Sequence, residues 1–391
     1  MKKSLVTGLL AVSLAASQAA FAADKVKVGF LSTLSGPAAG LGVDIRDGFQ
    51  LAMKHLGGRL GGVPAEILIT DDQQNPNTAM QATERFLKRD KVDFMTGIVF
   101  SNILLTVTKP IFDSQTFYIS ANAGPSQLAG AGCNPFFFNV SWQNDNVAEA
   151  MGKWATDQGY RNVIGVAPNY PAGKDAINGF KRFFKGNMVD EIYTKLGQLD
   201  YAAELAQLRA AKPDAVFFFL PGGMGINFVK QFVAAGLSKD MRLITSGFAA
   251  DEDVIPAIGE PLLGTFNSSH WAHDLDNPAN RKFVADFEKE YKRLPSLYAS
   301  QGYDAAMLID SAVRRVKGNL GDKAALRKAL AAAKFDSVRG KFRFNVNQYP
   351  IQDYYLRVVH RDGKGRITNK LMGTIFTDHA DAYVGECQMP K

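Results

Sequence analysis

The chain has 391 residues, of which 46% are hydrophobic and 21% are charged, and its formal net charge is +7. This apolar share is typical of folded cores rather than of a disordered chain, and the length suggests about two domains. Lysine and arginine form no long runs and no nucleic-acid-binding motif occurs, so the charge indicates a solvated surface and no nucleic-acid partner.

The first 22 residues have the pattern of a cleaved secretory signal. Met1-Lys2-Lys3 is basic, residues 5–16 are mostly apolar, and Ala20-Phe21-Ala22 has the small-x-small pattern of a signal-peptidase site. The alternative is an N-terminal membrane anchor, for which the apolar run is short. We therefore predict a signal peptide at 1–22 and a mature, exported protein of the periplasm.

From residue 25 onward, strand and helix patterns alternate. Strands are predicted at 25–31, 65–70, 92–96 and 116–120, with helices at 43–56, from 75 to 88 and from about 101. After a strand at 136–140 the alternation restarts, with helices at 144–158, 172–184, 202–211 and 224–235 and strands at 162–167, 189–194, 215–220, 242–245 and 263–266. Helices at 278–291, 298–317 and 322–333 follow without strands between them, before strands at 342–344 and 354–360. Alternation predicts parallel sheets covered by helices, and two successive runs predict two α/β lobes.

In open parallel sheets, ligands bind at the carboxyl ends of the strands. The loops at those ends are poor in catalytic groups and offer small, amide, hydroxyl and apolar side chains, which suits a binding cleft; they are residues 34–41, 99–102, 122–124, 169–173, 220–223 and 247–251.

Motifs for catalysis or for a cofactor are weak or missing. The glycines from Gly36 to Gly42 have no following lysine for phosphate, and Gly40-x-Gly42 is an incomplete dinucleotide fingerprint. No Gly-x-Ser-x-Gly motif occurs, and the spacing of His270, His273 and Asp274 matches no strong zinc pattern. Asp71-Asp72 is interpreted as a turn and helix cap, the alternative being an acid pair. We expect no enzyme activity, no cofactor and no metal.

The only two cysteines are Cys133 and Cys387. Export into an oxidising compartment favours pairing of an even number of cysteines, so we predict a disulfide between them. The alternative is two independent buried thiols.

A set of short motifs runs in order over nearly the whole mature chain: Val28-Gly29-Phe30, Leu34-Ser35-Gly36-Pro37, Gly42, Gly48, Asp71-Asp72, Asn75-Pro76, Ala79, Ala82, Asp90-Lys91-Val92, Gly97, Ser101, Ile119-Ser120-Ala121, Tyr170, Gly173, Asp214-Ala215-Val216 and Tyr303-Asp304-Ala305. In this order they resemble the extracytoplasmic solute-binding proteins of the leucine/isoleucine/valine type, which serve ABC importers. The resemblance implies a type I periplasmic binding protein, with two Rossmann-like lobes and a ligand cleft between them. The predicted lobes are 23–143 with 271–345, and 144–270 with 346–391, joined by three crossings. The implied partners are a small carboxylate and the ABC permease, and we expect a monomer.

The resemblance also implies a ligand site. Ser101 matches a position that holds the carboxylate of amino-acid ligands, as does the loop Asn122-Ala123-Gly124, although relatives commonly have threonine where Gly124 stands. Tyr170 matches a cleft tyrosine. The remaining predicted contacts are apolar or small and lie on loops around the cleft: Leu41, Phe100, Gly222 and Phe248, to which Tyr298 is added as a further candidate.

The position that binds the ligand's ammonium group in relatives falls on Ala249. A buried ammonium without its carboxylate costs about 3–5 kcal/mol, so a carboxylate without an amine is favoured, in particular an aromatic acid. Asp251 could replace the missing glutamate. Alternatives are a true leucine-like amino-acid or amide binder, a ligand-sensing module for a receptor, and an enzyme on a two-lobe α/β fold.

Overall fold

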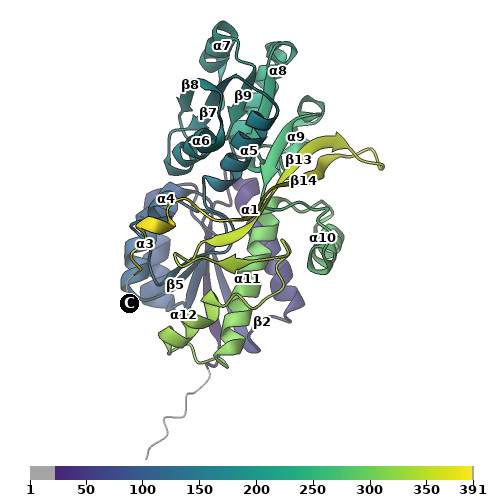
Figure 1. Cartoon of the computed structure of the whole chain (residues 1–391). Helices are drawn as coiled ribbons and strands as arrows, with labels where there is room; N and C mark the ends of the chain where they lie inside the picture. The colour runs from purple at the N-terminus through teal and green to yellow at the C-terminus, as the bar shows by residue number, and fades with distance from the viewer. Residues whose placement is uncertain (1–22, 390–391) are drawn as a thin grey trace, which may run out of the picture.

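We describe residues 23–389 of a computed structural model of the chain. The predicted signal peptide lies outside these residues. Two sheets, each covered by helices, form two lobes stacked along the long axis of the molecule (Figure 1). Within the described range, no helix is both long enough and apolar enough to cross a membrane.

The first sheet has the strand order β2-β3-β1-β4-β5-β6. All its neighbouring strands are parallel except the pair β2 and β3. Its strands are β1 (Val26–Ser32), β2 (Arg59–Leu60), β3 (Val63–Asp71), β4 (Phe94–Thr96), β5 (Phe117–Ser120) and β6 (Phe137–Asn139). Helices α1 (Ala39–His55), α2 (Pro76–Arg85), α3 (Ser101–Asp113), α4 (Ser126–Ala129), α10 (Pro278–Tyr291), α11 (Leu297–Arg315) and α12 (Lys323–Ala331) belong to this lobe.

The second sheet has five parallel strands in the order β11-β10-β9-β7-β8, extended by antiparallel β13 and β14. Its strands are β7 (Asn162–Pro168), β8 (Asn187–Thr194), β9 (Ala215–Phe218), β10 (Arg242–Ser246), β11 (Phe266–Ser269), β13 (Pro350–Arg361) and β14 (Ile367–His379). The two-residue strand β12 (Arg343–Phe344) pairs with the start of β13. The helices are α5 (Asn146–Asp157), α6 (Pro171–Phe183), α7 (Ala202–Ala211), α8 (Gly223–Ala234) and the short α9 (Ile255–Ile258). The predicted α/β fold class is thus confirmed, whereas the residue boundaries of the lobes stay a prediction.

Helices α1 and α11 cross at two glycines although they lie far apart in the sequence. A Cβ atom on Gly48 would stand 1.9 Å from the carbonyl oxygen of Ala299, and one on Gly302 would stand 2.0 Å from that of Ile45. Real Cβ atoms do not approach oxygen so closely, so only glycine permits this distance between the two helices. The contact fixes α11 against the first lobe.

Asp71 and Asp72 hold the loop that follows β1. Asp71 accepts a hydrogen bond from the N–H of Leu34 at 2.8 Å, and Asp72 accepts one from the hydroxyl of Thr33 at 2.6 Å. The helix cap predicted for this pair is instead Asn75, whose side chain accepts from the first turn of α2. A residue directly before the proline at the helix start was the better candidate for the cap.

The sulfur atoms of Cys133 and Cys387 lie 2.06 Å apart, and this disulfide attaches the C-terminal tail to the first lobe beside α4. We expect its removal to lower the free energy of unfolding by about 2–5 kcal/mol, because the unfolded chain loses a constraint on a very long loop. Urea unfolding of the wild type and of Cys133→Ser/Cys387→Ser tests this. Denatured, unreduced wild type should carry no free thiol, and two free thiols would contradict the bond.

Candidate functional site: a closed cavity between the lobes

A narrow cavity lies where the carboxyl ends of strands from both sheets meet. The first lobe supplies residues from the loops after β4 and β5, and the second lobe supplies residues from the loops after β7, β9 and β10. The connection after β6 and the start of α11 complete the wall. The lining side chains include no charged group; they are Val99, Phe100, Ser101, Asn122, Ala123, Trp142, Asn144, Tyr170, Ala172, Phe219, Pro221, Phe248 and Tyr298.

Ser101 is the first residue of α3 and is buried beside the cavity. The first N–H groups of a helix have no partner within the helix, and α3 has no side-chain cap. These N–H groups and the helix dipole favour an anion at this end. The Ser101 oxygen accepts a hydrogen bond from the Asn144 amide at 3.1 Å, while no described residue accepts the Ser101 hydroxyl hydrogen.

Aromatic rings form most of the remaining wall. The rings of Trp142 and Phe248 have centroids 4.0 Å apart, and Phe100 meets Tyr170 edge to face at 6.0 Å. Tyr298 meets Phe248 in the same way at 5.6 Å. Such an arrangement favours a flat, apolar ligand body, because stacking and edge contacts are the geometries that aromatic rings prefer.

Two phenol groups at the cavity have no hydrogen-bond partner in the described protein. Burial raises the pKa of Tyr170 and of Tyr298 far above the ordinary value of a phenol, so both remain protonated at neutral pH. Each can therefore donate a hydrogen bond to a ligand oxygen.

The structure places six of the ten predicted ligand-site residues on the cavity wall, namely Phe100, Ser101, Asn122, Ala123, Tyr170 and Phe248, together with the added candidate Tyr298. Asn122 is constrained, since its amide nitrogen donates to the carbonyl oxygen of Val99 at 2.7 Å. At least one of its two donor hydrogens is thus used within the protein.

Leu41 and Gly222 lie together outside the cavity wall. A Cβ atom on Gly222 would stand 3.6 Å from Leu41, and the neighbouring Gly223 donates its N–H to the carbonyl oxygen of Pro37 at 3.2 Å. The small-residue loop after β1 therefore meets the start of α8 across the cleft. Its place in this structure is the contact between the lobes, not the lining of the cavity.

Gly124 and Ala249 also lie off the wall. A Cβ atom on Gly124 would stand 2.2 Å from the carbonyl oxygen of Trp142, so the threonine common in relatives has no room here. Ala249 packs into the core of the second lobe near Gly225. Neither residue offers a side chain to a ligand in this arrangement.

The carboxylate of Asp251 forms an ion pair with the buried side chain of Arg357. It accepts from the Arg357 guanidinium at 2.8 Å and from the N–H of Glu252 at 2.7 Å, and it does not line the cavity. Arg357 also donates to Asn267 and to the carbonyl oxygen of Trp271. An ion pair that is fully buried has no free carboxylate to give to a ligand ammonium.

Sequence reasoning missed Trp142, Asn144 and Phe219. The loops predicted to line the cleft include Val99, Ala172 and Pro221, but these residues were not predicted individually. Trp142 and Asn144 lie on the first crossing between the lobes rather than directly at the end of a strand. The only available signal was their position between β6 and α5, where a connection must pass the cleft.

A larger hollow of about 850 Å³ lies between α1, α9 and the hairpin of β13 and β14, and most of the charged side chains that line it are paired with one another, although Asp253 has a buried oxygen without a partner among the described residues. Arg293 bonds to Asp44 and Asp47, and Arg366 bonds to Glu288. The smaller cavity has unused donors and aromatic walls, so it is the better candidate for a ligand site.

The three residues weighed as metal ligands do not converge. His270 is buried against Gln301, with ring and amide nitrogens 3.2 Å apart, and His273 faces Glu252 at 3.8 Å. Asp274 accepts from a backbone N–H of β14. Within residues 23–389, no group of three or more metal-binding side chains is close enough to hold an ion.

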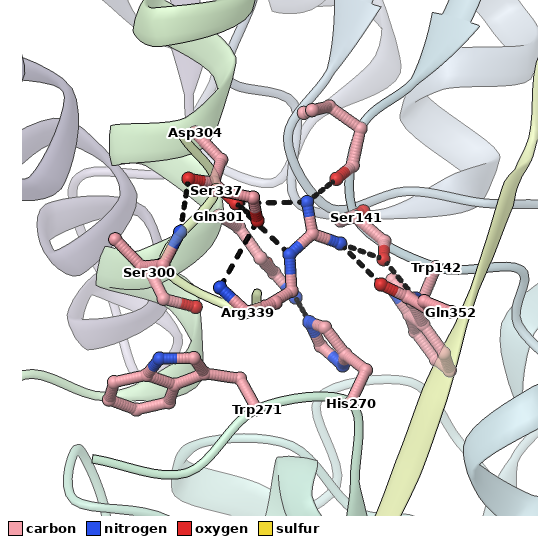
Figure 2. Close-up of polar contacts among 12 residues, drawn as sticks. Ser141, Trp142, His270, Trp271, Ser300, Gln301, Asp304, Ser337, Arg339 and Gln352 are labelled. Atoms are coloured by element: carbon pink, nitrogen blue, oxygen red, sulfur yellow. Dashed lines mark hydrogen bonds and ion pairs between the residues drawn. The ribbon is translucent and has the colours of Figure 1, made fainter. Parts of the chain in front are cut away.

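Arg339 connects two of the chain segments that cross between the lobes (Figure 2). Its guanidinium donates to the carbonyl oxygens of Val140 and Ser141 on the first crossing and to Gln352 on the third. It pairs with Asp304 of α11 at 3.0 Å, and both side chains are at most 1% exposed. The crossing that carries Trp142 is thus anchored to α11, which also carries Tyr298.

Comparisons with known proteins agree with this geometry. The family model for periplasmic binding proteins matches residues 25–364. A Leu/Ile/Val-binding protein homolog of Brucella melitensis is 30% identical over 96% of this chain and 97% of its own length.

Two solved structures from R. palustris are also similar. An ABC-transporter solute-binding protein in complex with benzoate has a TM-score of 0.88 and 33% identity, covering 93% of this chain and 99% of that chain. A second, from strain BisB5 and in complex with 3,4-dihydroxybenzoic acid, has a TM-score of 0.85 and 28% identity, covering 92% and 99%. The resemblance to solute-binding proteins of the leucine/isoleucine/valine type is therefore confirmed, and the chain belongs to the periplasmic binding protein family.

Proposed function

We propose that the protein captures a small aromatic carboxylate in the periplasm and delivers it to the permease of an ABC importer. One observation carries this proposal: the cavity is uncharged and walled by aromatic rings, and it has hydroxyl and helix N-terminal donors at Ser101. The carboxylate would lie at the start of α3, and the ring would lie among Phe100, Trp142 and Phe248. The benzoate and dihydroxybenzoate complexes of similar proteins support the same ligand class.

The absence of an acid on the cavity wall argues against an α-amino acid. Burial of an ammonium group without a counter-charge costs about 3–5 kcal/mol, which corresponds to a few hundred-fold to several thousand-fold in affinity. Asp251 does not supply this charge, because Arg357 holds it. The proposed role is binding and delivery without turnover, by a monomer whose signal peptide has been removed.

Ligand-dependent stabilisation tests the proposal. After unfolding and refolding to remove any co-purified ligand, we expect benzoate and 3,4-dihydroxybenzoate to raise the melting temperature. A ligand at a hundred times its Kd stabilises by about 2.7 kcal/mol. Leucine, isoleucine and valine should have little effect, and titration calorimetry should give the same ranking.

Benzylamine and benzamide serve as matched controls, since each keeps the ring and removes the negative charge. Strong stabilisation by leucine without any response to aromatic acids would refute the proposed ligand class. Stabilisation by benzylamine equal to that by benzoate would refute the carboxylate site at α3.

A further inference from the structure

We propose that Asn144 is a positioning residue that turns the Ser101 hydroxyl toward the ligand carboxylate, and that Asp175 of the opposite lobe holds Asn144 in place. This inference rests on the proposed function and adds to it the determinant by which the site distinguishes a carboxylate from an amide. It concerns three side chains that are buried and joined by hydrogen bonds.

The orientation of the Asn144 amide is fixed by its partners. The backbone N–H of Gly124 can only donate, and it lies 3.1 Å from Oδ1 of Asn144. The nitrogen Nδ2 must therefore point the other way, where it lies 3.1 Å from the Ser101 oxygen and 2.9 Å from Asp175. The exchange of oxygen and nitrogen that is ambiguous for many amides is excluded here by the Gly124 N–H.

This orientation determines what Ser101 can offer. Its oxygen already accepts a hydrogen bond from Asn144, so the hydroxyl hydrogen turns away from the amide. No described residue accepts that hydrogen, and Ser101 lies on the cavity wall. Both oxygens of a carboxylate accept, whereas an amide that turns its carbonyl oxygen toward Ser101 turns its NH₂ group toward the uncapped N–H donors of α3.

Asp175 connects this arrangement to the opposite lobe. It belongs to α6 of the second lobe and accepts from both the N–H and the hydroxyl of Ser126 in the first lobe, at 3.1 and 2.8 Å. Its second oxygen also accepts from Asn144 on the crossing between the lobes. The three hydrogen-bonded side chains thus come together where the lobes meet, so the donor at Ser101 is oriented when the cleft is closed.

A double-mutant cycle between Asn144→Ala and Ser101→Ala tests the coupling. We expect each single variant to weaken benzoate binding by about 10- to 100-fold, the loss typical of one hydrogen bond to a charged group. Asn144→Ala should add less than threefold when Ser101→Ala is already present. Ser114→Ala is the matched control: it removes a serine hydroxyl at the opposite end of α3, which donates to the carbonyl oxygen of Ile111 at 2.7 Å, and its Kd should stay within about threefold of wild type.

The ligand preference of Asn144→Ala gives a second, differently directed test. Without the Asn144 donor, the Ser101 hydroxyl is free to turn and to present its oxygen to a ligand NH₂ group as an acceptor. The ratio of benzamide to benzoate affinity should rise at least about tenfold, and the rise should vanish in combination with Ser101→Ala. If Asn144→Ala weakens benzoate binding by the same factor in the wild type and in Ser101→Ala, the two residues are not coupled and the proposal is overturned.

A crystal structure of the wild type with bound benzoate tests the proposal even if the variants do not fold. We expect the ligand carboxylate, Ser101 and Asn144 to lie in one hydrogen-bonded row, and a carboxylate bound away from Ser101 would refute the assignment. If the wild type binds leucine and not benzoate, the proposed aromatic ligand is wrong, but the role of Asn144 is still tested by measuring the same cycle with leucine against leucinamide. If the wild type binds no carboxylate, both the proposed function and the role of Asn144 are refuted.

Discussion

Replacing Arg339 with methionine is expected to lower the free energy of unfolding by about 3–5 kcal/mol, because it leaves Asp304 as an unpaired buried charge. Arg339 also donates to the Gln352 side-chain oxygen and to the carbonyl oxygens of Val140 and Ser141. The variant removes this donor from all three, and among the described residues only the Ser141 oxygen keeps a second donor, the amide nitrogen of Gln352. Urea unfolding, followed by circular dichroism, measures the change.

Two further variants separate the causes. Asp304→Asn in combination with Arg339→Met removes the unpaired charge and should restore part of the lost stability. Arg343→Met breaks an ion pair with Asp378 whose side chains are 58% and 49% exposed, so it should cost less than about 1 kcal/mol. If Arg339→Met and Arg343→Met cost the same, the buried network does not stabilise the crossings as described.

Replacing Trp142 with alanine should remove one wall of the cavity and weaken binding of the aromatic acid by about 10- to 100-fold, the range expected from the loss of a large buried apolar contact. Its ring packs against Phe248 at a tilt of 31°, and its indole N–H donates to the backbone oxygen of Asn122 at 2.7 Å. Stability should also fall by about 3–5 kcal/mol, as for other buried tryptophans. Titration calorimetry at a temperature where both proteins are folded gives the affinity.

Trp154→Ala provides the comparison. Trp154 is also buried, but it packs against Phe266 in the second lobe with ring centroids 4.8 Å apart and does not reach the cavity. Its loss should reduce stability to a similar extent and leave the Kd within about twofold, as expected for distant sites. An unchanged Kd in Trp142→Ala would show that the aromatic ligand does not lie against this ring.

The sequence predicted the order of strands and helices well because most strands are buried on both faces and end in small-residue loops. Strand β14 was not expected: none of its residues after Asn369 is buried, its side chains follow no apolar alternation, and the strand is held mainly by pairing with β13. Periodicity detects a buried face, and an exposed antiparallel hairpin provides little of it.

The cavity was predictable only where residues follow a strand end directly. Ser101 and Tyr170 meet that condition, whereas Asn144 belongs to a crossing whose path depends on how the two lobes pack. Asp251 shows a different limit, since its partner Arg357 lies 106 residues away in sequence. No local pattern indicates that such a pair forms, so the availability of the acid could not be decided before the structure.

The glycine crossing of α1 and α11 also bears on the order in which the chain can fold. The two helices are separated by roughly 250 residues, so their contact requires the closure of a very long loop. The five parallel strands of the second lobe lie within residues 162–269 and need no such closure. Contacts between near neighbours in sequence form faster than distant ones. During synthesis, the five parallel strands of the second lobe are therefore made before the first lobe receives α11, and β13 and β14 of the second lobe follow only after that.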